Sequence, residues 1–213
     1  MSDAKSVILG RIRSALSDGF TAPEPVRNYR RVSQISQEDT IEMLIDRLID
    51  YKANVFQATE DTLASVIAER LGEKSTYVIP VGLKDSWLPA DTADRKRVVD
   101  SGSTLKEHAL SHRELDEVDA VVTSSTVSCA ETGTIFLNSN PDEGRRAISL
   151  VPDHHICVVS RDSVVELVPE AIERITYERP VTMISGPSAT SDIELIRVEG
   201  VHGPRTLDVI ILN

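Results

Sequence analysis

The chain has 213 residues, 40% of them apolar, and a formal net charge of -11, which is enough for one sizeable hydrophobic core. The negative charge argues against nucleic acid and anionic membrane surfaces as partners, because both select Lys and Arg. No apolar run approaches the roughly 20 residues of a membrane span, and the N-terminus lacks a signal-peptide core. We therefore expect a cytoplasmic protein. The two cysteines, Cys129 and Cys157, lie in apolar runs, which favours reduced core thiols over a disulfide framework.

The first half of the chain alternates predicted helices and strands. In order, these are an amphipathic helix over 3–17, an extended basic linker over 19–34, a helix over 36–52 capped by Ser36, a strand at 54–58, a helix over 59–71 ended by Gly72, a strand at 75–80, a turn or short helix at 84–88 and a strand at 97–100. This alternation predicts an α/β domain with a mainly parallel sheet between helices. The first helix either packs on the domain as an arm or docks on a partner.

The second half of the chain is richer in predicted strands. These lie at 120–123, 126–130, 133–137, 147–151, 155–160, 181–184 and 207–212, with one helix over 163–175. We find no internal repeat. The sequence is therefore divided into a peripheral N-terminal helix with its linker, residues 1–35, and a single domain, residues 36–213.

A polar stretch over 185–205 separates the last two predicted strands. Polar loops at strand ends are where binding groups usually lie. The candidate ligand contacts are Gly186, Ser188, Thr190, Asp192, Glu194, Arg197, His202, Gly203 and Arg205. A helix beginning near Thr190 would offer free backbone amides to a phosphate or carboxylate, and Arg197 or Arg205 could add a bidentate contact. The alternative is a network in which the acidic and arginine side chains of the stretch satisfy one another.

Two further segments carry candidate chemistry. Glu131 lies in a predicted tight turn between strands, where a buried carboxylate could act as base, acid or nucleophile and an exposed one would be a plain turn residue. Asp153 and His154 lie at the end of an apolar run, but His154 and His155 would point to opposite faces of a strand and cannot share a metal. His108 and His112 have helical spacing without a third ligand, so no metal site is predicted.

Four segments resemble the LUD-domain family, and within it the group that serves lactate utilisation. They are Ala130–Thr134, Leu150–Ile156, Ser185–Glu194 and Val198–Arg205. The resemblance runs from about residue 36 to the end, with an N-terminal helix that is also similar. It implies a fold like that of the NagB/RpiA/CoA-transferase superfamily. It also implies a role in oxidising L-lactate to pyruvate, in a complex with two cysteine-rich iron–sulfur proteins that would hold the clusters, with no cofactor in this chain.

The resemblance also suggests roles for individual residues. The superfamily includes enzymes with a catalytic glutamate, so Glu131 is the candidate equivalent, and His202 is the second catalytic candidate. The remaining candidate ligand contacts are Thr132, Gly133, Asp153 and His154.

Three functions stay open at this point. The chain is a subunit of a lactate-oxidising complex, a transferase or isomerase that uses Glu131, or a non-catalytic scaffold for a small anionic metabolite. A single site requires Glu131 to lie within a side chain's reach of 188–192 or 202–205. We expect that site on the side of the sheet where α/β proteins bind ligands.

Overall fold

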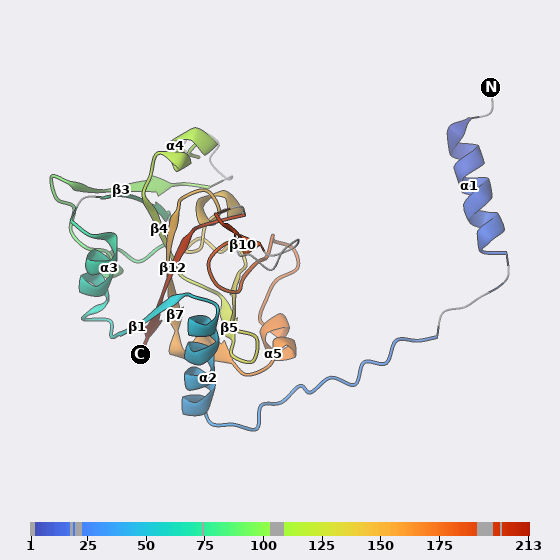
Figure 1. Ribbon diagram of the computed structural model, residues 1–213, viewed down its shortest axis with the longest axis horizontal. Coiled ribbons are helices and arrows are strands. Elements are labelled where there is room, and N and C mark those ends of the chain that lie inside the picture. Colours follow the sequence, from blue (N-terminus) through green and yellow to red (C-terminus); the bar gives the residue numbers. More distant parts are fainter. Residues whose placement is uncertain are drawn as a thin grey trace.

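The computed structural model describes residues 3–17, 19, 23–73, 75–102, 109–190, 198–200 and 202–213 (Figure 1). The elements are α1 (Ala4–Ala15), α2 (Gln37–Asp50), β1 (Asn54–Ala58), α3 (Leu63–Leu71), β2 (Ser75–Pro80), η1 (Asp85–Trp87), β3 (Arg95–Asp100), α4 (His112–Asp116), β4 (Ala120–Thr123), β5 (Val127–Cys129), β6 (Thr134–Leu137), η2 (Arg146–Ser149), β7 (His154–Ser160), η3 (Arg161–Ser163), β8 (Val164–Val165), α5 (Val168–Glu173), β9 (Thr182–Ile184), β10 (Ala189–Thr190), β11 (Val198–Glu199) and β12 (Thr206–Leu212). Within these residues, no helix is both long and apolar enough to cross a membrane.

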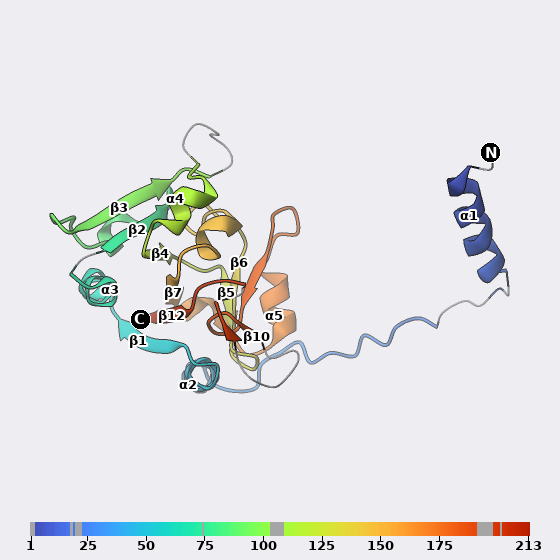
Figure 2. The same ribbon diagram turned by 45° about the horizontal axis from the view of Figure 1, so that its top comes forward.

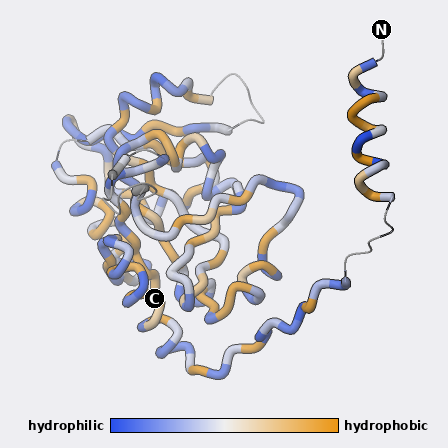
Figure 3. Tube along the Cα trace, turned by 45° about the vertical axis from the view of Figure 1, so that its right-hand side comes forward, coloured by the Kyte–Doolittle hydropathy of each residue, from blue (hydrophilic) through white to orange (hydrophobic). Residues whose placement is uncertain are grey.

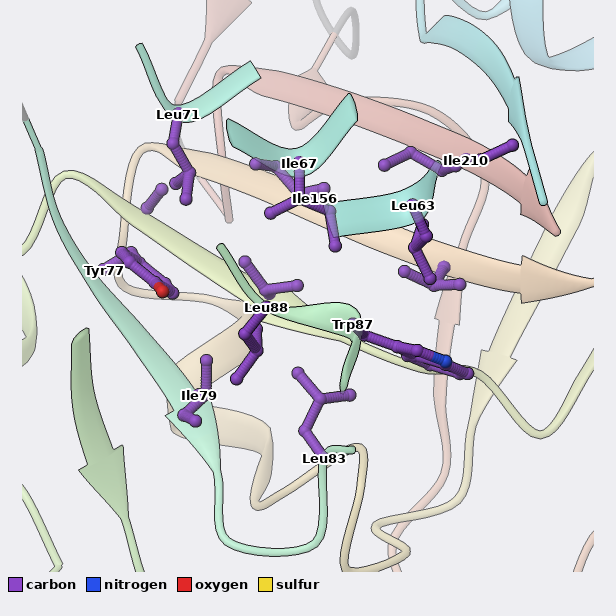
Figure 4. Close-up of a cluster of buried hydrophobic side chains, with 14 of the residues drawn as sticks. Leu63, Ile67, Leu71, Tyr77, Ile79, Leu83, Trp87, Leu88, Ile156 and Ile210 are labelled. Carbon is purple, nitrogen blue, oxygen red and sulfur yellow. The ribbon is translucent and has the colours of Figure 1, made fainter. Parts of the chain in front are cut away.

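The core of the fold is a six-stranded sheet with the order β1-β12-β7-β4-β2-β3, in which every pairing is parallel. The predicted α/β class with a mainly parallel sheet is therefore confirmed. Alternate residues of β7 serve opposite faces, because successive side chains on a strand point in opposite directions. Ile156 and Val158 pack under α3 and η1, whereas Cys157 and Val159 pack under α2. Figure 4 shows the first of these clusters, with Leu63 and Ile67 of α3 lying over the strands.

Local signals in the sequence explain where the helices begin and end. The Ser36 hydroxyl accepts a hydrogen bond from the Asp39 amide and so caps α2, as predicted. The apolar stripe of α2 is buried at Ile41, Leu44 and Leu48. Gly72 ends α3 with a φ of 76°, a backbone conformation that side chains disfavour.

A second sheet, with the order β8-β5-β6-β9, covers part of the same face as α2 (Figure 2). It explains an error in the predicted helix over 163–175. Val164 and Val165 pair with β5 instead, so tertiary pairing overrides the helical spacing of the apolar residues. Pro169 also confines α5 to a later start, because proline is tolerated only in the first turn of a helix. The strand expected at 181–184 exists as β9 but belongs to this second sheet.

The strand predicted at 147–151 is also wrong, since this segment forms the 3-10 helix η2. Ile148 lies in an apolar cluster with Val78, Val121 and Leu115, which shows that η2 packs across the strands rather than pairing with them. Periodicity alone cannot distinguish such a short apolar run from a strand.

The N-terminal helix α1 buries none of its residues. Val7, Ile8, Ile12 and Leu16 are all exposed, and Figure 3 shows hydrophobic positions distributed along a helix that stands apart from the rest of the chain. The linker contacts the domain at Arg30, which pairs with Glu131, and at Arg31, which pairs with Glu173 at 3.2 Å. Of the two predicted alternatives for this helix, packing of α1 on its own domain is not observed.

Candidate functional site

The described parts of the polar stretch lie at the amino edge of the parallel sheet. Thr206, the first residue of β12, is in register with His154, the first residue of β7, so Arg205 and Asp153 directly precede two neighbouring strands. We expected this stretch on the side where α/β sheets bind ligands, which is the carboxyl edge. That expectation is wrong, because segments that lead into parallel strands necessarily gather at their amino ends.

Ser188 organises the described part of the loop. Its amide donates to the Pro204 carbonyl at 2.8 Å, its carbonyl accepts from the Gly200 amide at 3.2 Å, and its hydroxyl accepts from the His202 amide at 2.8 Å. Ala189–Thr190 forms β10, which pairs antiparallel with β11. Thr190 itself is therefore in a strand, and residues 191–197, over which the expected helix would run, lie outside the described residues.

One ion pair and one histidine–carboxylate contact follow the loop along the amino edge. Arg205 pairs with Asp153 at 2.9 Å, and His154 contacts Asp208 at 3.0 Å. Asp208 is buried and also accepts a hydrogen bond from the Asn54 side chain at 2.7 Å. Arg205 thus belongs to a self-satisfied pair, although its partner is Asp153 rather than an acidic residue of the stretch. Asp192, Glu194 and Arg197 lie outside the described residues.

A cavity of about 270 Å³ lies between this loop and η2. Its walls include Ser188, His202 and Gly203 from the loop and Arg146 and Ser149 from η2. It adjoins a larger, open cavity of about 740 Å³, with which it shares Arg146, Leu150, His202 and Gly203. Four of the predicted residues therefore line this one cavity: Gly186, Ser188, His202 and Gly203.

Arg146 also lines this cavity but was not among the candidate residues predicted from the sequence. It lies exposed at the start of η2, and its guanidinium group has no ion pair or hydrogen bond within the part of the chain that the structure describes. Five N–H donors in a planar fork suit a carboxylate or a phosphate. The available signal was only a basic pair, Arg145 and Arg146, before an apolar run.

His155 forms a buried part of the cavity wall. Its Nε2 lies 2.8 Å from the Thr123 hydroxyl, and burial lowers the pKa of His155 to about 3, so the ring is neutral at pH 7. Burial also raises the pKa of Cys157 to about 12, which keeps this thiol protonated and unreactive. The predicted division of the two histidines is confirmed, because His154 faces the Asp208 carboxylate and His155 faces the core.

The predicted turn around Glu131 joins β5 to β6, as expected. The Glu131 carboxylate forms an ion pair with Arg30 of the linker, and its side chain is 45% exposed. Of the two alternatives for Glu131, the exposed turn residue is therefore the one observed.

The turn contacts the start of the polar stretch through hydroxyl groups. Thr132 and Thr134 share a hydrogen bond of 2.8 Å, and Thr134 contacts Ser185 at 2.9 Å. Glu131 itself shares no hydrogen bond or ion pair with the described residues of 188–190 or 202–205. A single site that includes Glu131 remains a prediction.

Two glycines of these motifs are required by close approach to α2. A Cβ on Gly133, whose φ is 58°, would lie 2.7 Å from the Arg47 Cβ. A Cβ on Gly186, whose φ is 89°, would lie 2.7 Å from Tyr51. These glycines hold the turn and the loop against the C-terminal end of α2 and so fix the entrance to the polar stretch.

Comparison with known proteins identifies the family. The sequence model of the LUD domain matches residues 27–212, so the chain belongs to the LUD domain family. Lactate utilization protein C of Deinococcus radiodurans is 40% identical, over 100% of this chain and 97% of that protein. Lactate utilization protein C of Bacillus subtilis is 26% identical, over 92% of this chain and 90% of that protein. The crystal structure of a DUF162 family protein from D. radiodurans matches with a TM-score of 0.69 and 36% identity, covering 84% of this chain and 99% of that one.

Proposed function

We propose that this chain acts in lactate utilisation, as a component of an L-lactate-oxidising system that binds a small anionic metabolite. The observation that carries this proposal is its full-length similarity to a relative named lactate utilization protein C, at 40% identity. That name, shared by the B. subtilis relative, supports the role in lactate utilisation. Oxidation of L-lactate to pyruvate within a multiprotein complex is the finer part of the proposal.

The cavity of about 270 Å³ between the polar loop and η2, called the amino-edge cavity from here on, is the proposed binding site for the metabolite. Lactate and pyruvate are carboxylates, and the unpaired Arg146 guanidinium at this cavity provides a bidentate partner for such a group. Ser188 and His202 line the same cavity. In a chain with a net charge of -11, an unpaired arginine beside polar groups offers local attraction for an anion.

The iron–sulfur clusters of such a system would belong to partner proteins. A cluster takes about four thiolates, and this chain has only Cys129 and Cys157. Both thiols are buried, and they lie in different core clusters, so these residues do not fit a cluster. We propose two cysteine-rich proteins as the partners that carry the electrons.

The test is reconstitution with the two proposed cysteine-rich partner proteins, followed by lactate-dependent reduction of a dye. Activity is expected to require this chain. Arg146→Gln is expected to raise the lactate concentration at half-maximal rate by roughly tenfold, the value of one charge-assisted contact. Arg113→Gln is the matched control, because Arg113 is a 90% exposed arginine on α4. Full activity without this chain contradicts the proposal, and an Arg146→Gln variant that behaves like Arg113→Gln removes the amino-edge cavity from it.

A non-catalytic binding role is the second candidate function. The ion pair between Glu131 and Arg30 favours it over a transferase or isomerase, because the carboxylate is engaged by a linker arginine and is not held inside a cavity. Binding of lactate or pyruvate by the purified chain, without any turnover alone or with partners, would favour the scaffold.

A further inference from the structure

A separate cavity lies at the carboxyl edge of the sheet, opposite the polar stretch. It has a volume of about 390 Å³, within the range of small-molecule pockets. Val81 follows β2, Ser101 and Gly102 follow β3, and the segment 139–146 closes the other side. We propose that this cavity is a second binding site, for a small organic anion with a phosphate or carboxylate head group. The inference does not depend on the proposed role in lactate utilisation.

The topology of the sheet favours a ligand at this position. From β2 the chain moves outward to its neighbour β3, whereas from β4 it moves the other way, to β7 and then β12. The strands that follow β2 and the strands that follow β4 are therefore added on opposite sides of this adjacent pair. In open α/β sheets, the crevice at the carboxyl ends of such a strand pair is the usual ligand position.

The segment that closes the cavity is held firmly over these strand ends. The Gly82 amide, just after β2, donates to the Pro141 carbonyl at 2.9 Å, and the Ser124 amide, just after β4, donates to the Asp142 carbonyl at 3.1 Å. Buried Glu143 accepts hydrogen bonds from the amides of Asn138 at 2.6 Å and Asn140 at 3.0 Å. The wall of the cavity is thus organised before any ligand arrives, which lowers the entropic cost of binding.

The lining is positively charged although the whole chain is strongly acidic. Arg145, Arg146 and Arg179 line the cavity together with a single carboxylate, Asp100. The Asp100 side chain is fully buried and is neutralised by Arg145, whose Nη2 lies 2.7 Å from its Oδ2. Arg146 is unpaired among the described residues, and the Arg179 contact to Asn140 occupies only one of its nitrogens. Guanidinium donors therefore remain available for an anion.

Two serines of the lining have features that the described residues do not explain. The Ser101 hydroxyl is shielded from solvent and has no hydrogen-bond partner within the described part of the chain. Such groups normally carry a cost of about 1–3 kcal/mol unless a partner satisfies them. Ser139, also on the lining, has a φ of 51°, a conformation that side chains rarely adopt and that collects at ligand sites. An anion in the cavity would accept hydrogen bonds from the arginines.

The experiment is a titration of the ¹⁵N-labelled full chain, at constant ionic strength, with inorganic phosphate and, separately, with pyruvate. At least one probe is expected to shift the amide signals of Ser101, Gly102 and Gly144 along a saturating curve. The probe with the tighter Kd identifies the head group.

Variants locate the binding within the chain. Arg179→Gln is expected to weaken the Kd by roughly tenfold. Ser188→Ala, in the amino-edge cavity, and Arg113→Gln are expected to leave the Kd unchanged. Arg146 is not used, because it lines the cavities at both edges. No saturating shift with either probe overturns the proposal, as does an Arg179→Gln Kd equal to that of Arg113→Gln.

Discussion

His155 makes the stability of this fold depend on pH in a way that one substitution can isolate. The ring is buried beside Thr123, and its pKa is lowered to about 3, first by burial and then by the nearby charge of His154. In the unfolded chain the same ring has an ordinary pKa near 6.5. The unfolded state therefore binds a proton that the folded state does not, and stability falls as pH falls below 6.5. Above that pH the contribution is fully present.

The size of the effect follows from the two pKa values. Between pH 6 and pH 4, linkage makes His155 alone remove about 1.4 kcal/mol of stability per pH unit. From pH 7 to pH 4.5 the loss amounts to roughly 2.5 kcal/mol, a large fraction of the ordinary stability of a domain. His155→Gln keeps a polar contact for Thr123 but cannot titrate, so this part of the pH dependence disappears.

The assay is urea unfolding of the wild type and His155→Gln at pH 7, 6, 5 and 4.5. The variant is expected to be less stable at pH 7, because a glutamine does not fill the space of the ring. The stability of the wild type relative to the variant should fall by roughly 2.5 kcal/mol from pH 7 to pH 4.5, since contributions of the carboxylates cancel. Parallel curves for the two proteins over this range would refute the reasoning.

Two further substitutions and one truncation test separate parts of the fold. Gly186→Ala places a methyl group 2.7 Å from Tyr51 at a φ of 89° and should cost at least about 1–2 kcal/mol in urea unfolding, whereas Gly10→Ala, with nothing within 4 Å, should not destabilise. Arg145→Met leaves the buried Asp100 carboxylate unpaired and should cost about 3–5 kcal/mol, and an unchanged Tm would contradict that loss. Removal of residues 1–29 should leave the Tm within a few degrees of wild type, because α1 buries nothing.

Sequence predicted those features of the fold that depend on neighbours in the chain. The Ser36 cap, the Gly72 stop and the alternation along β7 are local, and all are present. The strand status of Val164–Val165 depends on pairing with β5, far away in sequence, and was not predictable from spacing. The contact of Glu131 with Arg30 joins residues 101 positions apart in the sequence, so no local sequence pattern predicts it.

Chain order alone determines the edge of the sheet at which the end of the 185–205 stretch lies, although the prediction of that edge was wrong. Residues 185–205 lead into β12, and the residue before a parallel strand can only lie at its amino end. Arg146 is a different case, because one arginine before a short apolar run carries no signal until η2 places it between the cavities. Order along the chain therefore fixes the edge, whereas membership of a cavity depends on packing.

The motifs that mark the family divide into residues that shape the fold and residues that face open space. Gly133 and Gly186 are held against the end of α2, and Thr134 joins them through Ser185, so these positions are fixed by packing. Ser188 and His202 line the amino-edge cavity. Substitution of the glycines should therefore reduce stability before it reduces binding. His202→Ala, at an exposed side chain, should do the reverse, and equal losses of stability would show that His202 too is structural.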